Sequence, residues 1–179
     1  MKEKQKKTSE GVTFRIPSNT VHELRKESNK KQVSLNTLVN QILKEHLDWH
    51  TYAAQARLYH VPRSSMSRII DKLTEEELSE VAVTIAKKDF VDLGLLLRGE
   101  FTLSSFLDIL ENWSRVSAFP YKHEVNNDMH NFIIEHGMGK NYSFLLKEIY
   151  RNIMEDMFET RSDFITTDNT IVFRFNMSD

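Results

Sequence analysis

The stretch VTFRIPSN, Val12 to Asn19, decides how the beginning of the chain folds. Its apolar residues Val12, Phe14 and Ile16 alternate with polar ones, which is the period of a β-strand with one apolar face. Pro17 stops the strand because proline has no backbone N–H to donate. The stretch therefore predicts a short strand that gives way to a helix.

Two amphipathic helices are predicted after the proline. Ser18 is a helix-capping residue type, and the apolar residues that follow it share one face, which predicts a helix over about 18–30. Ser34 is placed to cap a second helix. Its apolar residues recur at steps of three and four: Leu35, Leu38, Val39, Ile42, Leu43 and Leu47.

A lone strand has no partner in a helical segment, and an unpaired edge with one apolar face is unstable. The simplest solution is antiparallel pairing with the same strand of a second chain. We therefore expect a homodimer, and whether dimers associate further stays open. An ordinary dimerisation module without a nucleic-acid partner would show the same pattern.

These features resemble the ribbon-helix-helix DNA-binding proteins, the class of the Arc and Met repressors. The resemblance covers residues 11–50, and "SLN" begins seventeen residues after Pro17, as in Arc-like members. Many members have a glycine between the helices, whereas Asn29–Gln32 contains none. We therefore expect Asn29 or another polar residue to take the left-handed conformation there. The C-terminal region resembles no family that we identify.

The resemblance implies that the paired strands enter the major groove of double-stranded DNA. By position, Gly11, Thr13 and Arg15 would face the bases. Arg15 is able to bind guanine and Thr13 a base edge or a thymine methyl, while Gly11 offers no side chain. A solvated surface arginine is the alternative for Arg15.

The resemblance also implies phosphate contacts at the start of the second helix. The Ser34 hydroxyl and the amides of Leu35 and Asn36 would hold one phosphate, helped by the positive end of the helix. Lys6 and Lys7, in a basic tail over 1–11 that we expect to be flexible, would attract phosphates without sequence preference.

The charge distribution agrees with such a partner. Residues 1–50 contain ten Lys or Arg and six Asp or Glu, a net charge of +4, so the other 129 residues carry −6. The chain has no cysteine, and no run of 18 apolar residues occurs. We expect a cytoplasmic protein without a membrane span, a disulfide or a cofactor.

Residues 51–118 are predicted to form a helical linker or bundle. Thr74 and Glu77 make a capping box, Gly99 closes an apolar run, and Thr102 caps a helix that ends before Pro120. Residues 119–179 are predicted to be a small α+β domain of order ββαββ. The expected fold is thus mainly α, with an α+β C-terminus that has a regulatory or oligomerising role by analogy.

Three histidines of the C-terminal domain are metal-ligand candidates. His123, His130 and His136 fall on adjacent predicted strands, and neutral imidazoles bind divalent transition metals. The nickel-responsive relatives of the family bind metal in their own C-terminal domains. The spacing matches no specific signature, so surface or core histidines are the favoured interpretation.

The run HGMGKNYS, residues 136–143, joins a predicted strand to a helix. Its Gly137, Gly139 and Lys140 form a layout able to hold an anion on backbone amides. The spacing differs from the phosphate loop G-x-x-x-x-G-K-[ST], and a plain turn is the favoured alternative.

No nucleophile, base and orienting group can be assembled from the sequence motifs, so we expect no enzyme. The preferred interpretation is a homodimeric, sequence-selective transcriptional regulator with an unknown effector. One alternative is an antitoxin-like interaction protein that only dimerises through its N-terminus. Another is a sensor of anions or metabolites centred on residues 137–140.

Overall fold

The computed structural model describes residues 9–53 and 55–177. The chain divides into two compact units, Met1–Lys44 and Glu45–Asp179. The sequence predicted boundaries after residues 50 and 118 instead. The structure places the first one six residues earlier, and residues on both sides of position 118 belong to the same unit.

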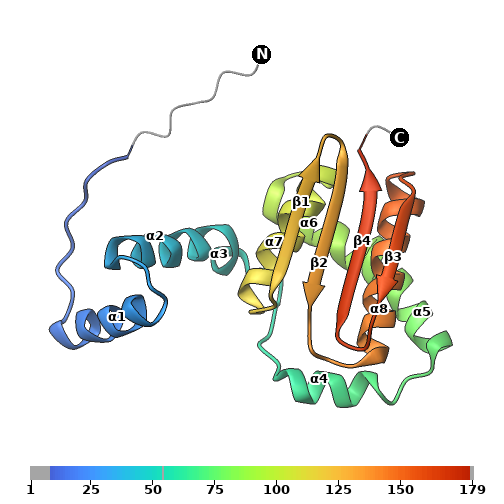
Figure 1. The fold of residues 1–179 in the computed structure, drawn as a ribbon, viewed down its shortest axis with the longest axis horizontal. Coiled ribbons are helices and arrows are strands. Elements are labelled where there is room, and N and C mark those ends of the chain that lie inside the picture. Colours follow the sequence, from blue (N-terminus) through green and yellow to red (C-terminus); the bar gives the residue numbers. More distant parts are fainter. Residues whose placement is uncertain (1–8, 54, 178–179) are drawn as a thin grey trace. The chain divides into compact units, whose positions relative to one another are not determined.

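The smaller unit contains the two predicted helices, α1 (Ser18–Lys30) and α2 (Leu35–Glu45) (Figure 1). The first has the predicted extent, whereas the second ends before Leu47, which was predicted to belong to it. Ser18 is the first helical residue and not the cap, because Pro17 takes the N-cap position with φ −53° and ψ 140°. In the turn between the helices, Gln32 has φ 54°. A polar residue thus takes the left-handed conformation, as predicted for a turn without glycine.

The strand predicted over 12–16 is not formed in the single chain: residues 9–17 carry no regular secondary structure. A strand is defined by hydrogen bonds to a neighbouring strand, and no described segment of this chain pairs with these residues. Of the predicted ribbon-helix-helix, the structure therefore contains the two helices and an unpaired segment.

The larger unit begins with helices and ends with an antiparallel sheet (Figure 1). Its helical elements are η1 (His46–His50), α3 (Thr51–Ala53), α4 (Arg63–Ile70), α5 (Glu75–Thr84), η2 (Ile85–Asp89), α6 (Phe90–Arg98), α7 (Leu103–Val116), α8 (Lys140–Arg151) and η3 (Asn152–Met157). The predicted helix signals are confirmed at three places. Thr74 closes a capping box with Glu77, Thr102 caps α7, and Gly99 ends α6 with φ 74°.

The sheet has the strand order β1-β2-β4-β3, and each neighbouring pair is antiparallel. Its strands are β1 (Tyr121–Asn126), β2 (Met129–Glu135), β3 (Ser162–Thr166) and β4 (Thr170–Asn176). With α8 between β2 and β3, the predicted order ββαββ is confirmed.

One hydrophobic core joins the sheet to the helices that lie on one of its faces (Figure 1). Phe132 and Phe173 from the strands are fully buried, as are Leu78 of α5, Phe106 of α7 and Tyr150 of α8. Because neither layer buries its apolar face alone, the helices before residue 118 and the sheet after it form one unit. This shared core explains why the helical segment 51–118 and the α+β segment 119–179 belong to one unit.

Candidate functional site

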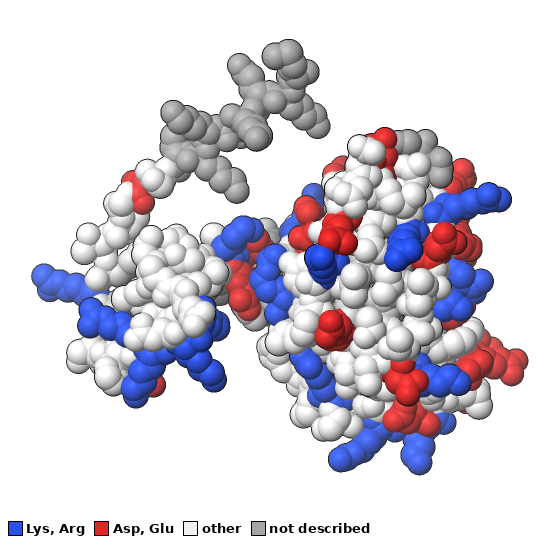
Figure 2. Space-filling model, viewed as in Figure 1, with Lys and Arg blue, Asp and Glu red and all other residues white. Residues whose placement is uncertain are grey.

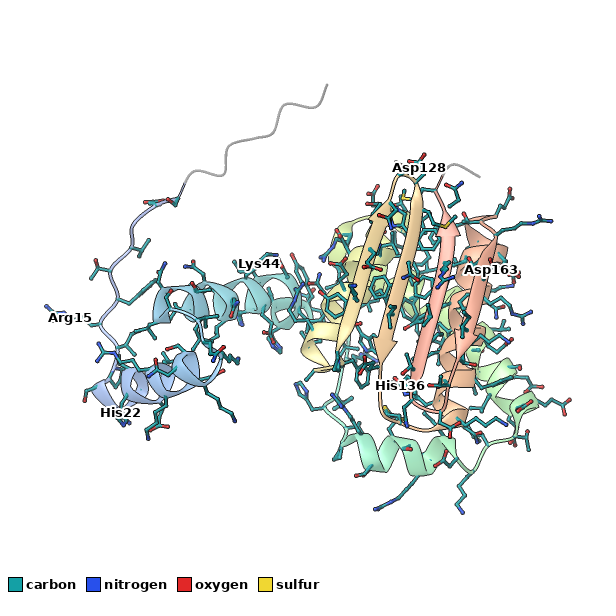
Figure 3. All side chains as sticks on the ribbon, viewed as in Figure 1. Arg15, His22, Lys44, Asp128, His136 and Asp163 are labelled. Atoms are coloured by element: carbon teal, nitrogen blue, oxygen red, sulfur yellow. The ribbon has the colours of Figure 1, made fainter. Side chains whose placement is uncertain are left out.

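The three predicted base-reading residues lie in the unpaired segment before α1. Gly11, Thr13 and Arg15 are all exposed. Arg15 makes no hydrogen bond or ion pair with another described residue, and its side chain points away from α1 and α2 (Figure 3). The guanidinium is therefore available to an external acceptor.

The opposite set of side chains in the same segment is apolar and also exposed. Val12 is 64%, Phe14 62% and Ile16 41% exposed. In the described part of the smaller unit, Leu38 is the one buried apolar side chain, at 1% exposure. A unit of this size with so little buried apolar surface does not reach the stability of an independent domain.

The start of α2 has the geometry of an anion-binding helix end. Ser34 Oγ accepts a hydrogen bond from the Thr37 amide at 3.0 Å and lies 2.8 Å from Thr37 Oγ1. The amides of Leu35 and Asn36 have no acceptor among the described residues. The three predicted phosphate-contacting residues thus lie together at the positive end of α2, whereas Lys6 and Lys7 fall outside the described residues.

Basic side chains dominate the smaller unit. Figure 2 shows Lys and Arg around α1 and α2, whereas both signs of charge are interspersed over the larger unit. Two of these lysines are offset by acids: Lys26 pairs with Glu23 at 2.8 Å and Lys31 with Glu27 at 2.6 Å. Such exposed pairs contribute little to stability, so both lysines remain able to exchange their partner for a phosphate.

His136 makes no hydrogen bond or ring contact with the other two histidines that the sequence grouped with it. It follows the end of β2 and is fully buried. Ser143 Oγ donates to the Thr167 carbonyl at 2.6 Å, so it accepts from His136 Nε2 at 2.8 Å. The Met138 amide donates to His136 Nδ1 at 3.0 Å.

Both ring nitrogens of His136 are thus used inside the protein, and the ring is held as the neutral Nε2–H tautomer. Burial lowers the pKa of His136 from 6.5 to about 4. With neither nitrogen free, His136 cannot complete a metal site with His123 and His130, which corrects the grouping that the sequence suggested.

The side chains of His123 and His130 contact each other, and Glu111 of α7, which the sequence pattern did not indicate, contacts His123. His123 Nδ1 lies 2.8 Å from Glu111 Oε1, and His123 Nε2 lies 2.9 Å from His130 Nδ1. The pKa of His130 is lowered, first by burial and then by the charge of His123. Among the described residues, no group of three or more His, Cys, Asp or Glu side chains is arranged to hold a metal ion.

In the loop that contains Gly137, Gly139 and Lys140, the amides of the two glycines are used inside the protein. The amide of Gly137 donates to the Asn169 carbonyl at 3.3 Å, and that of Gly139 donates to Asn169 Oδ1 at 3.2 Å. The glycines are needed because φ is 64° at Gly137 and 91° at Gly139. These contacts use two of the amides that the predicted anion site would need, which favours the plain strand-to-helix turn.

Comparison with known proteins adds no assignment: no protein-family model matches the chain, and no curated protein is significantly similar to it. Among the described residues, none of the helices has the length and apolar character required to cross a membrane.

Proposed function

We propose that the protein is a homodimeric, sequence-selective DNA-binding regulator that reads the major groove with a two-stranded ribbon. The observation that carries the proposal is the segment 12–16, whose apolar residues Val12, Phe14 and Ile16 remain exposed in the single chain. A second copy of the same segment, paired antiparallel, would cover this apolar face and satisfy the free backbone groups of both strands.

The expected gain from such pairing is large enough to hold two chains together. Burying a Val, Ile or Phe side chain contributes about 1.5–3 kcal/mol. Three such side chains from each chain offer on the order of 10 kcal/mol before the cost of association is subtracted. The smaller unit, with Leu38 as its one buried apolar side chain among the described residues, would gain its core in this way.

Dimerisation would present the polar face of the ribbon to DNA. In this arrangement Thr13 and Arg15 of both chains face the bases, and the free amides at the start of each α2 receive a phosphate. The exposed Arg25 and Lys30 of α1 add positive charge without sequence preference. An antitoxin-like protein would share the dimer but need no preference for a DNA sequence.

The test is selection of the full-length protein on a random-sequence DNA pool at near-physiological salt, followed by sequencing. We expect an enriched motif with two-fold symmetry, because the two strands of the ribbon are related by a two-fold axis. Retention that falls with salt and enriches no motif would refute sequence-selective recognition and favour a protein-interaction role.

A further inference from the structure

A pocket of about 400 Å³ opens in the larger unit, a size suited to small-molecule ligands. Its walls are mostly aromatic and apolar. The lining includes Trp49 of η1, Trp113 of α7, Tyr142 of α8 and Phe119, which precedes β1, together with residues of the segment 58–61. Trp49 and Trp113 are the two tryptophans of the whole chain.

The cation in this pocket is held in place by the protein. Arg63, the first residue of α4, donates through Nη2 to the carbonyls of Ser117 and Ala118, the latter at 2.6 Å. Its guanidinium carbon lies 4.5 Å from the centre of the Phe119 ring. Nε and Nη1 of Arg63 have no acceptor among the described residues. The charge is thus fixed while part of its donor capacity is unused.

A second donor lines the same pocket. Tyr142 is only 9% exposed, and its hydroxyl has no hydrogen-bond partner in the described part of the chain. Burial raises the pKa of Tyr142, and the positive charge of Arg63 acts in the opposite direction. The hydroxyl therefore keeps its proton at neutral pH and remains able to donate a hydrogen bond.

The charge of the lining selects the class of ligand. None of the described lining residues is acidic, so the guanidinium has no counter-ion within the pocket. A cationic ligand would be repelled by Arg63, and a wholly apolar ligand would leave the free donors of Arg63 and Tyr142 without an acceptor. A multiply charged anion would lose more hydration than one arginine can replace.

We propose that this pocket binds a small aromatic monocarboxylate. The ring lies against the tryptophan and phenylalanine side chains, and the carboxylate accepts hydrogen bonds from Arg63 and the Tyr142 hydroxyl. This inference goes beyond the proposed DNA recognition and does not depend on it, because every residue involved belongs to the larger unit.

The experiment is titration of the full-length protein, without DNA, with benzoate, phenylacetate and the neutral phenylacetamide. Because both tryptophans line this pocket and a second one of about 630 Å³, intrinsic fluorescence reports the occupation of either pocket. Calorimetry measures the affinity independently, and the variants below assign the binding to this pocket. We expect saturable binding of at least one acid, with phenylacetamide at least about ten-fold weaker than phenylacetate, the loss of one charge-assisted hydrogen bond.

Two variants and a matched control test the assigned residues. Arg63→Gln should reduce the affinity for phenylacetate to that for phenylacetamide and leave the affinity for phenylacetamide unchanged. Tyr142→Phe should lower the affinity for phenylacetate more than the affinity for phenylacetamide. As the matched control, Arg68→Gln removes the same charge from an exposed position of α4 outside the pocket lining. It should change neither the affinity for phenylacetate nor that for phenylacetamide. The proposal is overturned if no acid gives saturable binding to the wild-type protein, or if both pocket variants weaken acid and amide equally.

Discussion

His136 shows how contacts at one residue convert an apparent ligand into a structural group. Its ring donates to Ser143 and accepts from the Met138 amide, so the neutral form is required in the folded state. In the sequence, this histidine fell on a predicted strand and looked similar to His130. The contact with Ser143, which lies in the helix that follows, distinguishes the two.

The lowered pKa of His136 predicts that stability falls in mild acid. The unfolded chain takes up a proton near pH 6.5, whereas the folded chain does so only near pH 4. The stabilising contribution is therefore complete above pH 6.5 and is lost as the pH falls toward 4. Between pH 7.5 and 5 the free energy of unfolding should decrease by about 2 kcal/mol from this residue alone.

Urea unfolding of the wild type and of His136→Gln at both pH values measures this effect. The pKa of His130 is lowered too, so the difference between the two proteins, rather than the wild-type profile, isolates His136. We expect the variant to be less stable at pH 7.5 and less sensitive to acid. Parallel pH profiles for the two proteins would show that His136 is not the group responsible.

At the scale of the elements, local signals in the sequence predicted most of the fold. The caps at Thr74 and Thr102 and the glycine at 99 act within a few residues of themselves, so they are visible without tertiary structure. The burial of alternate residues in β4, Ile171 and Phe173 among them, follows from strand period.

What the sequence did not reveal depends on distant contacts or on a second chain. Arg63 reaches carbonyls 54 and 55 residues away, and no local pattern indicates that pairing. Glu111 joins His123 from a helix whose period gave it no special role. The segment 12–16 has the pattern of a strand in sequence yet is unpaired in the single chain, and the partner that we propose for it is another copy of the chain.

The unpaired segment predicts a variant that separates dimerisation from folding of the larger unit. Phe14→Glu should shift the protein from dimer to monomer, because it places a charge on the apolar face that we expect the second strand to cover. Thr13→Glu adds the same charge to the opposite face of the segment and should leave the dimer intact. Sedimentation equilibrium at micromolar concentration tests both, and a wild-type monomer, or equal effects of the two changes, would argue against a ribbon.

On the scale of the whole molecule, the two units should unfold separately. The larger one has its own core, whereas the smaller one gains most of its proposed core by association. The midpoint of its transition should therefore rise with protein concentration, by mass action, while that of the larger unit should not.

Because both tryptophans lie in the larger unit, their fluorescence follows that unit alone, and far-ultraviolet circular dichroism follows both. We expect the dichroism signal to contain an additional, concentration-dependent transition. A single transition, identical by both probes and independent of concentration, would contradict this description.

The most direct test of the proposed function compares Arg15→Ala with Arg25→Ala on DNA. Both changes remove one exposed positive charge from the smaller unit, but only Arg15 is expected to face a base. Binding is measured to the selected motif and to a scrambled duplex at equal salt. Arg15→Ala should reduce the difference in binding free energy between the two duplexes by about 1–3 kcal/mol, whereas Arg25→Ala should lower the affinity for both duplexes by the same factor. If Arg15→Ala instead lowers the affinity for the two duplexes equally, Arg15 contacts only the phosphate backbone, and recognition of sequence by this ribbon is contradicted.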